Sequence, residues 1–132
     1  MKRTIIWSIL LSVLLYGCNQ PKYSNYYSFD NQIWFQDSSI VFDFNSDNST
    51  KLNFEINLSY DNNYPFQNLY TTYSLIDSEK NVINSNMIEL QLFEKKYGYP
   101  LGSGVFNSFI IDSTFLKTQN ILKNEDYKLL IK

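Results

Sequence analysis

Apolar and polar residues alternate most clearly over residues 51–60, where every second side chain is large and apolar: Leu52, Phe54, Ile56, Leu58 and Tyr60. A period of two is typical of a β-strand with one face on a core and the other in water. Residues 40–44 repeat the pattern on a shorter strand, with an apolar face made by Ile40, Phe42 and Phe44. Residues 45–50, between the two strands, are polar, so we expect the pair to form a β-hairpin.

Further short strands with polar turns are predicted downstream, over residues 68–76, 82–93, 105–111 and 127–131. Residues 94–104 hold three of the four glycines and predict a loop, and residues 113–122 hold at most one short helical turn. Several short strands joined by turns indicate an all-β fold. We expect an antiparallel β-sandwich of the immunoglobulin-like or jelly-roll-like kind.

The amino-terminal residues have the pattern of an export signal. Lys2 and Arg3 precede an apolar run over residues 5–15. This run is too short to cross a hydrocarbon core of ~30 Å as a helix, but it suits a secretory signal peptide. The run is followed by Gly17 and Cys18, which look like the cleavage and lipidation site of a bacterial lipoprotein.

Lipidation of Cys18 would make it the first residue of the mature chain. We therefore expect a signal peptide over residues 1–17, a lipidated cysteine with its tether over 18–25, and a β-sandwich domain over 26–132. Acyl chains would hold the domain on a membrane of the cell envelope without a transmembrane helix. Residue 19 is Asn and not Asp, which favours the outer membrane over the inner one. The alternative is an ordinary secretory signal with a free thiol.

Composition excludes several kinds of chemistry. The chain has no histidine, which excludes Ser-His-Asp triads and HExxH zinc sites. A single cysteine excludes a disulfide framework and a cysteine-rich metal cluster. The formal charge of -2 gives no basic surface for nucleic acid. The acidic residues fall in no recognisable motif, so we expect no catalysis, no cofactor and no metal ion.

Two loops superficially resemble ligand sites. Residues 43–49 alternate oxygen-bearing side chains as a calcium loop does, but Asn48 replaces the required glycine and Phe54 the bidentate glutamate. Residues 98–104 are rich in glycine but lack the lysine of a phosphate-binding loop. We interpret both as turns.

Aromatic residues make up 17% of the chain, and two interpretations are open. They can fill the core of a sandwich, which we favour, or they can form an exposed surface that binds a protein or a glycan. Tyr23, Tyr26 and Tyr27 lie close to the tether, and we do not expect all three to be buried.

Three stretches together resemble the gliding motility lipoprotein family GldH. Residues 26–44 carry a Trp and an Asp-Ser pair ahead of an apolar strand, and residues 60–70 carry an Asn-rich turn followed by Tyr-Pro-Phe. Residues 101–104 lie ahead of a predicted strand, and residues 126–128 open another. The residues that carry the resemblance are Trp34, Asp37, Tyr64, Pro65, Phe66, Asn68, Gly102, Gly104 and Tyr127.

The resemblance implies a non-enzymatic envelope lipoprotein that supports the machinery moving adhesins along the surface of gliding bacteria, which is linked to type IX secretion. We expect it to dock other envelope proteins of that machinery. The alternative function is a non-catalytic carbohydrate-binding surface lipoprotein. Two departures stand out: Glu125 replaces a glycine of the family, and Lys132 ends the sequence where the family has another strand. Either the C-terminal strand is lacking, or a partner completes the sheet.

Overall fold

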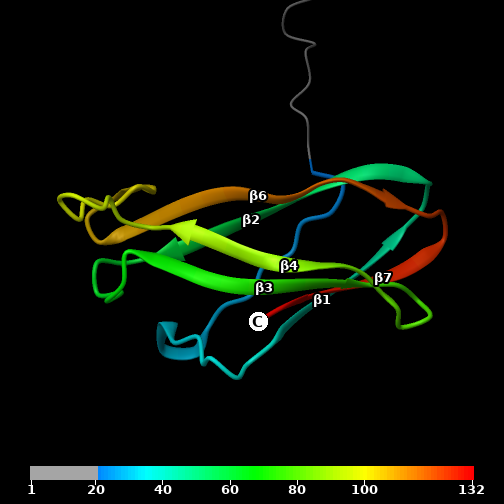
Figure 1. Ribbon diagram of the computed structural model, residues 1–132, viewed down its shortest axis with the longest axis horizontal. Helices are drawn as coiled ribbons and strands as arrows, with labels where there is room; N and C mark the ends of the chain where they lie inside the picture. Colours follow the sequence, from blue (N-terminus) through cyan, green and yellow to red (C-terminus); the bar gives the residue numbers. More distant parts are fainter. Residues whose placement is uncertain (1–20) are drawn as a thin grey trace, which may run out of the picture.

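The computed structural model describes residues 21–132, which fold into two antiparallel β-sheets packed face to face (Figure 1). Gly17, Cys18 and the expected signal peptide lie outside the described residues. One 3₁₀ turn and seven strands make up the described part: η1 (Asp30–Gln32), β1 (Ile40–Ser46), β2 (Thr50–Tyr60), β3 (Asn68–Ile76), β4 (Val82–Gln91), β5 (Ser103–Val105), β6 (Ser108–Ile121) and β7 (Glu125–Ile131). Among these residues no helix is long and apolar enough to cross a membrane. The all-β sandwich expected from the sequence is confirmed.

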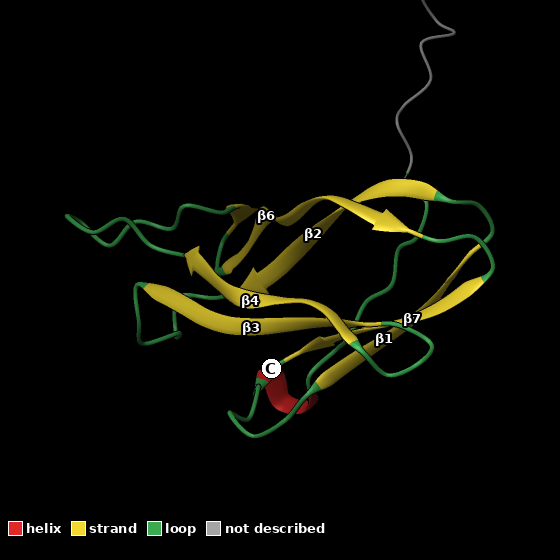
Figure 2. Cartoon of the chain, turned by 45° about the vertical axis from the view of Figure 1, so that its right-hand side comes forward, coloured by secondary structure: helices red, strands yellow, loops and turns green. Residues whose placement is uncertain are grey.

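The strand order is β1-β7-β3-β4 in one sheet and β2-β6-β5 in the other (Figure 2). The first strand therefore lies beside the last, and the second beside the last but one. An immunoglobulin sandwich has a different order, with its first two strands adjacent in one sheet. The order here instead places β1 beside β7 and β2 beside β6, while β3 and β4 form a hairpin.

The expected hairpin between the first two strands is wrong. β1 pairs with β7, with Ile40 opposite Ile131, whereas β2 pairs with β6 in the other sheet. The chain crosses between the sheets at Ser46, whose Oγ donates to the carbonyl of Asn48 and whose own carbonyl accepts the Asn124 amide. Both strands face the same core from opposite sheets. Period-two alternation identifies the buried face of a strand but not the neighbouring strand.

Residues 113–122 form no helical turn, because β6 continues through them as a strand to Ile121. Its register against β2 shifts twice, between Leu52 and Phe54 and between Phe54 and Glu55. These irregularities add residues to β6 and bring the neighbours Phe115 and Leu116 into contact with the core. Extra residues of this kind break the alternation on which the prediction relied.

Strand ends around the glycine-rich segment also differ from expectation. β4 ends at Gln91 and not at residue 93, although Phe93 still forms an isolated bridge with Pro100. The strand predicted over 105–111 is divided by a turn into β5 and the start of β6. Most of the predicted loop over 94–104 is indeed irregular, and only its last two residues belong to β5.

The core lies between the sheets, and most of its buried side chains come from the four-stranded sheet. Tyr127, Leu129 and Ile131 of β7 are all buried, as their alternation predicts. Phe44 and Tyr127 stack with ring centroids 5.4 Å apart. The largest fully buried side chains are Leu75, Leu90, Leu92 and Ile121. Aromatic residues therefore do help to fill the core, but many others lie on the surface.

Candidate docking surfaces

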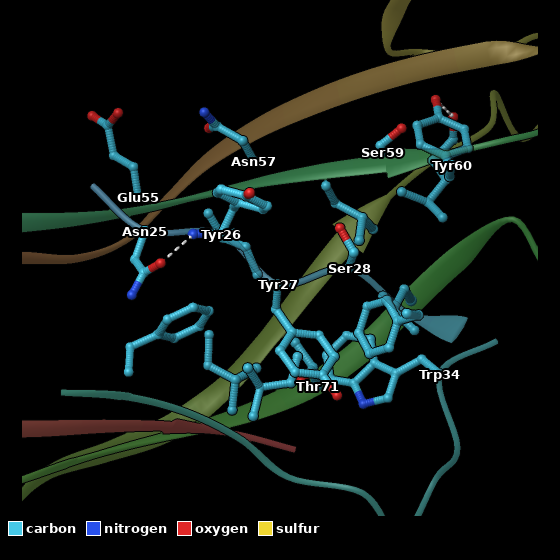
Figure 3. A pocket seen from close by; sticks show the side chains of 18 of the residues that line it. Asn25, Tyr26, Tyr27, Ser28, Trp34, Glu55, Asn57, Ser59, Tyr60 and Thr71 are labelled. Atoms are coloured by element: carbon cyan, nitrogen blue, oxygen red, sulfur yellow. Dashed lines mark hydrogen bonds between the residues drawn. The ribbon is translucent and has the colours of Figure 1, made fainter. Parts of the chain in front are cut away.

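An open groove of ≈ 2770 Å³ runs along the inner face of β2, where the two sheets separate (Figure 3). The inward side chains of β2 alternate as predicted, but each is only half-buried. The reason is the position of β2, which is an edge strand with β6 on one side and no strand on the other. Opposite β2, the groove is lined by apolar residues of the other sheet: Phe42, Leu129 and Ile131.

Residues 21–36, which we call the strap, cross the mouth of this groove. Lys22 Nζ donates to Thr50 Oγ1 at the start of β2, at 3.2 Å, and Tyr23 OH donates to the carbonyl of Asp43 on β1, at 2.6 Å. Further along, Phe29 stacks on Trp34 with centroids 5.0 Å apart. The strap thus joins the free edges of the two sheets through side chains.

Exposed apolar side chains gather at the end of the sandwich where β2 stops and β6 starts. We call this region the aromatic end; it comprises the loop 61–67, the loop 92–102 and residues 105–107. Its outward side chains are 52% to 98% exposed: Phe66, Tyr97, Tyr99, Leu101, Val105 and Phe106. The rings of Tyr97 and Tyr99 lie 6.0 Å apart at an angle of 42°, and Lys96 Nζ lies 4.7 Å from the Tyr97 centroid. Exposed apolar side chains gathered at one end of a protein point to an interaction site.

Hydrogen bonds join the loops of the aromatic end to one another. The carbonyl of Gln67 accepts the amides of Leu92 and Phe93, at 2.8 and 3.0 Å. Asn107 Oδ1 accepts the amide of Asn62, at 3.0 Å. The exposed rings therefore stand on a fixed frame, which lowers the entropy lost on binding a partner.

Tyr60 links the end of β2 to the loop 92–102 through its hydroxyl. The hydroxyl donates to the carbonyl of Leu92 at 2.7 Å and accepts the amide of Gly102 at 2.8 Å. A Tyr60→Phe variant leaves both backbone groups without this partner, and we expect it to lose about 1–3 kcal/mol of unfolding free energy. Urea unfolding of the variant and the wild type measures the difference, and a loss below about 0.5 kcal/mol would contradict the assigned role.

Backbone geometry presents the ring of Phe106 to solvent. Phe106 has a φ of 58° in the turn between β5 and β6 and is 98% exposed. A side chain in this left-handed region costs roughly 1–2 kcal/mol, and glycine is the usual residue there. Two residues earlier, a Cβ on Gly104 would meet the carbonyl oxygen of Ser108, so the hairpin requires glycine at that position. A phenylalanine that combines a strained backbone with 98% exposure points to a binding role.

The residues that carry the family resemblance lie in three places. One group lies at or beside the aromatic end: Tyr64, Pro65, Phe66, Asn68, Gly102 and Gly104. Trp34 lies in the strap, half-buried, with Nε1 3.5 Å from the Ser38 carbonyl, and Asp37 lies exposed just after it. Tyr127 lies in the core towards the other end of the sandwich, where its hydroxyl accepts the Leu122 amide and donates to Glu125.

Three groups in the described part of the chain have clearly shifted pKa values. Burial raises the pKa of Tyr64, and burial, with a smaller contribution from Glu125, raises the pKa of Tyr127. Hydrogen bonds from Asn68 and Tyr70 lower the pKa of Glu89. Residues 21–132 hold no cluster of side chains suited to a metal ion. The three groups lie apart: Tyr64 is in a loop of the aromatic end, Glu89 is on β4, and Tyr127 is on β7.

Sequence reasoning missed Tyr97, Tyr99 and Phe106 as surface residues. The prediction for this segment considered only its glycines, as a phosphate-binding loop or as a turn. The available signal was aromatic residues within a Gly- and Pro-containing loop, since such loops run over the surface. By contrast, Tyr23, Tyr26 and Tyr27 were not expected to be all buried, and all three are exposed.

Comparison with known protein families shows to which family this chain belongs. The model of the family described as GldH lipoprotein matches residues 22–132. The chain belongs to the GldH lipoprotein family. A curated relative, gliding motility lipoprotein GldH of Flavobacterium johnsoniae, is 28% identical over 121 residues, which cover 91% of this chain and 70% of the relative. No solved structure gives a significant match.

Membership in the GldH family makes this chain a lipoprotein associated with gliding motility and held to a membrane of the cell envelope. The family is not a known class of enzymes. The resemblance inferred from the sequence is thereby confirmed, and the sandwich described above gives this GldH protein a fold.

Proposed function

We propose that this GldH protein is a membrane-held docking module that performs no catalysis. Acyl chains on Cys18 anchor it, residues 18–25 tether it, and the domain over 26–132 binds another envelope protein of the gliding and type IX secretion machinery. The observation that carries the proposal is the aromatic end, where three hydrogen-bonded segments hold exposed rings in fixed positions. We assign the anchor to the outer membrane, because Asn19 follows the cysteine.

The tether supports this arrangement because it is short. The three steps from Cys18 to Pro21 span at most about 11 Å when extended. Lys22 is bound to Thr50, the first residue of β2, whereas the aromatic end lies beyond Tyr60, the last. The ten steps from Thr50 to Tyr60 rise roughly 3.3 Å each, about 33 Å in all. The aromatic end therefore lies well away from the point where the tether meets the domain.

A protein partner fits the aromatic end better than a carbohydrate does. Sugar rings stack on flat aromatic platforms, but Tyr97 and Tyr99 are tilted by 42° and lie on a loop and not on a sheet face. Phe66, Val105 and Phe106 add apolar surface without hydrogen-bonding groups. Aromatic residues with a basic residue nearby are typical of the centre of protein–protein interfaces.

A triple variant at the aromatic end tests the proposal: Phe66→Ser, Tyr99→Ser and Phe106→Ser. We expect cells that carry it to lose surface spreading, because the anchors of the interface are gone, while the protein stays membrane-bound and folded. The replaced side chains are exposed, so we expect the substitutions to change the free energy of unfolding only slightly. Colony spreading, membrane fractionation and thermal unfolding of the purified protein are the measurements.

The matched control replaces three exposed apolar residues elsewhere: Val82→Ser, Met87→Ser and Leu122→Ser, which are 59%, 60% and 60% exposed. We expect the control to spread normally. Normal spreading by the aromatic-end variant, or equal loss in both variants, would refute the assignment of the docking surface.

A further inference from the structure

The free edge of β2 differs from the other long edges of the sandwich. β2 presents 11 residues with no strand on one side, and its inward side chains remain half-buried. β4 is also an edge strand, but its inward Ile88 and Leu90 are already buried. β1 likewise buries Ile40 and Phe44. On β1 only Phe42 is half-buried, so the longest row of half-buried apolar side chains that an added strand would cover lies on β2.

No strand of the described residues pairs with the free edge of β2, although the strap lies across the groove beside it. Its outer-face side chains turn towards β6: Asn53 Oδ1 accepts the Thr118 amide at 2.9 Å, and Glu55 Oε1 accepts the Thr114 hydroxyl at 3.3 Å. Within residues 21–132, no backbone hydrogen bond joins the strap to β2. Long free edges without proline or cover pair readily with another strand.

We propose that β2 pairs antiparallel with β2 of a second copy of this chain, about a two-fold axis at Asn53. In this register Lys51 lies opposite Glu55 of the second copy, and Glu55 opposite its Lys51. On the inner face Leu52 lies opposite Phe54 of the second copy. Cross-strand pairs of opposite charge and of apolar residues are the units that stabilise antiparallel sheets. The two three-stranded sheets become one sheet of six strands.

Charge selects this register. Lys51 and Glu55 are the charged residues of β2, and only a centre at Asn53 places each opposite its complement. A centre at Glu55 would instead set two carboxylates against each other, which is destabilising. Residues that lie opposite each other in neighbouring strands point to the same face of the sheet. A shift of one strand by one residue would therefore turn the apolar side chains of that strand to the solvent face.

The anchors are compatible with this symmetry. A two-fold axis perpendicular to the joined sheet keeps each face of the sheet on the same side, so both tethers leave on one side. Lys22 binds Thr50, three residues from Asn53, so each strap begins near the axis. Two anchors in one membrane also raise the effective concentration of the copies. The two aromatic ends would point away from each other.

Disulfide trapping in intact cells tests the dimer, because the mature chain has no cysteine other than Cys18. At the proposed axis residue 53 faces itself, so Asn53→Cys is expected to give a dimer band on a non-reducing gel. Asn57→Cys is the control. Residue 57 lies on the same strand and face, but in this register the two residues 57 of the dimer are about 26 Å apart. A monomer at Asn53→Cys, equal bands in both variants, or capture of a different protein would overturn the proposal.

Charge reversal provides a second test that does not depend on a new cysteine. Lys51→Glu and Glu55→Lys each place like charges opposite each other, and we expect each to weaken dimerisation about tenfold. The double swap restores the pairing and should restore the dimer, as measured by sedimentation of the full chain in detergent. Failure of the swap to restore it would contradict the register. Neither test depends on the partner of the aromatic end. A failure of the dimer proposal can therefore be told apart from a failure of the docking proposal, which is tested by spreading.

Discussion

A Cys18→Ala variant is expected to carry no lipid. The chain has a single cysteine, so no other thiol can accept the diacylglyceryl group. Each buried methylene of an acyl chain contributes ~0.8 kcal/mol to membrane binding, and two chains are enough for stable anchoring. Removing them is therefore an all-or-none change. Incorporation of labelled palmitate into the immunoprecipitated protein, and the mass of the purified chain, measure it directly.

The control for lipidation is Ser12→Ala, which alters the apolar run of the signal and leaves Gly17 and Cys18 intact. We expect it to incorporate label normally. A further variant carries a cleavable secretory signal in place of residues 1–18, and we expect its product to be free of the membrane. Label on Cys18→Ala, or a free thiol on the wild-type protein, would contradict the lipoprotein assignment.

A Leu75→Ala variant is expected to lose about 2–5 kcal/mol of unfolding free energy, because the truncation leaves a cavity in a close-packed core. Leu75 is 0% exposed and lies on β3, between β7 and β4. A loss of this size is a large share of the ~5–15 kcal/mol that holds a domain folded. Chemical denaturation with linear extrapolation is the measurement.

Leu122→Ala is the matched control for the core, since Leu122 is exposed and contributes little packing. We expect a change within about 0.5 kcal/mol. If Leu75→Ala were as stable as Leu122→Ala, the position of the core between the two sheets would be wrong.

The alternation of apolar and polar residues predicted which face of each strand is buried, because that alternation is set within each strand and does not depend on the neighbouring strand. The alternation at Leu52, Phe54 and Ile56 and at Tyr127, Leu129 and Ile131 identified inward side chains correctly. Pairing could not be predicted in the same way. The partner of β1 is β7, far along the chain, as in the hydrogen bond between Asn45 and Asp126, which are 81 residues apart.

Irregular backbone limited the rest of the prediction. The register shifts opposite Phe54 lengthen β6 and hide its alternation, so the strand looked like a possible helical turn. The aromatic end is made of loops, which have no period that a sequence can reveal. Its frame depends on contacts such as that between Gln67 and Leu92, which only the folded chain brings together.

Photo-crosslinking from the aromatic end in intact gliding cells tests the central claim most directly. A photoreactive residue is placed at position 106 in one strain and, as the matched exposed site elsewhere, at position 122 in another. The docking account predicts a specific adduct with one envelope protein from position 106, lost when Phe66 and Tyr99 are replaced by serine, and no such adduct from position 122. No adduct at position 106, or the same adducts at both positions, would contradict it.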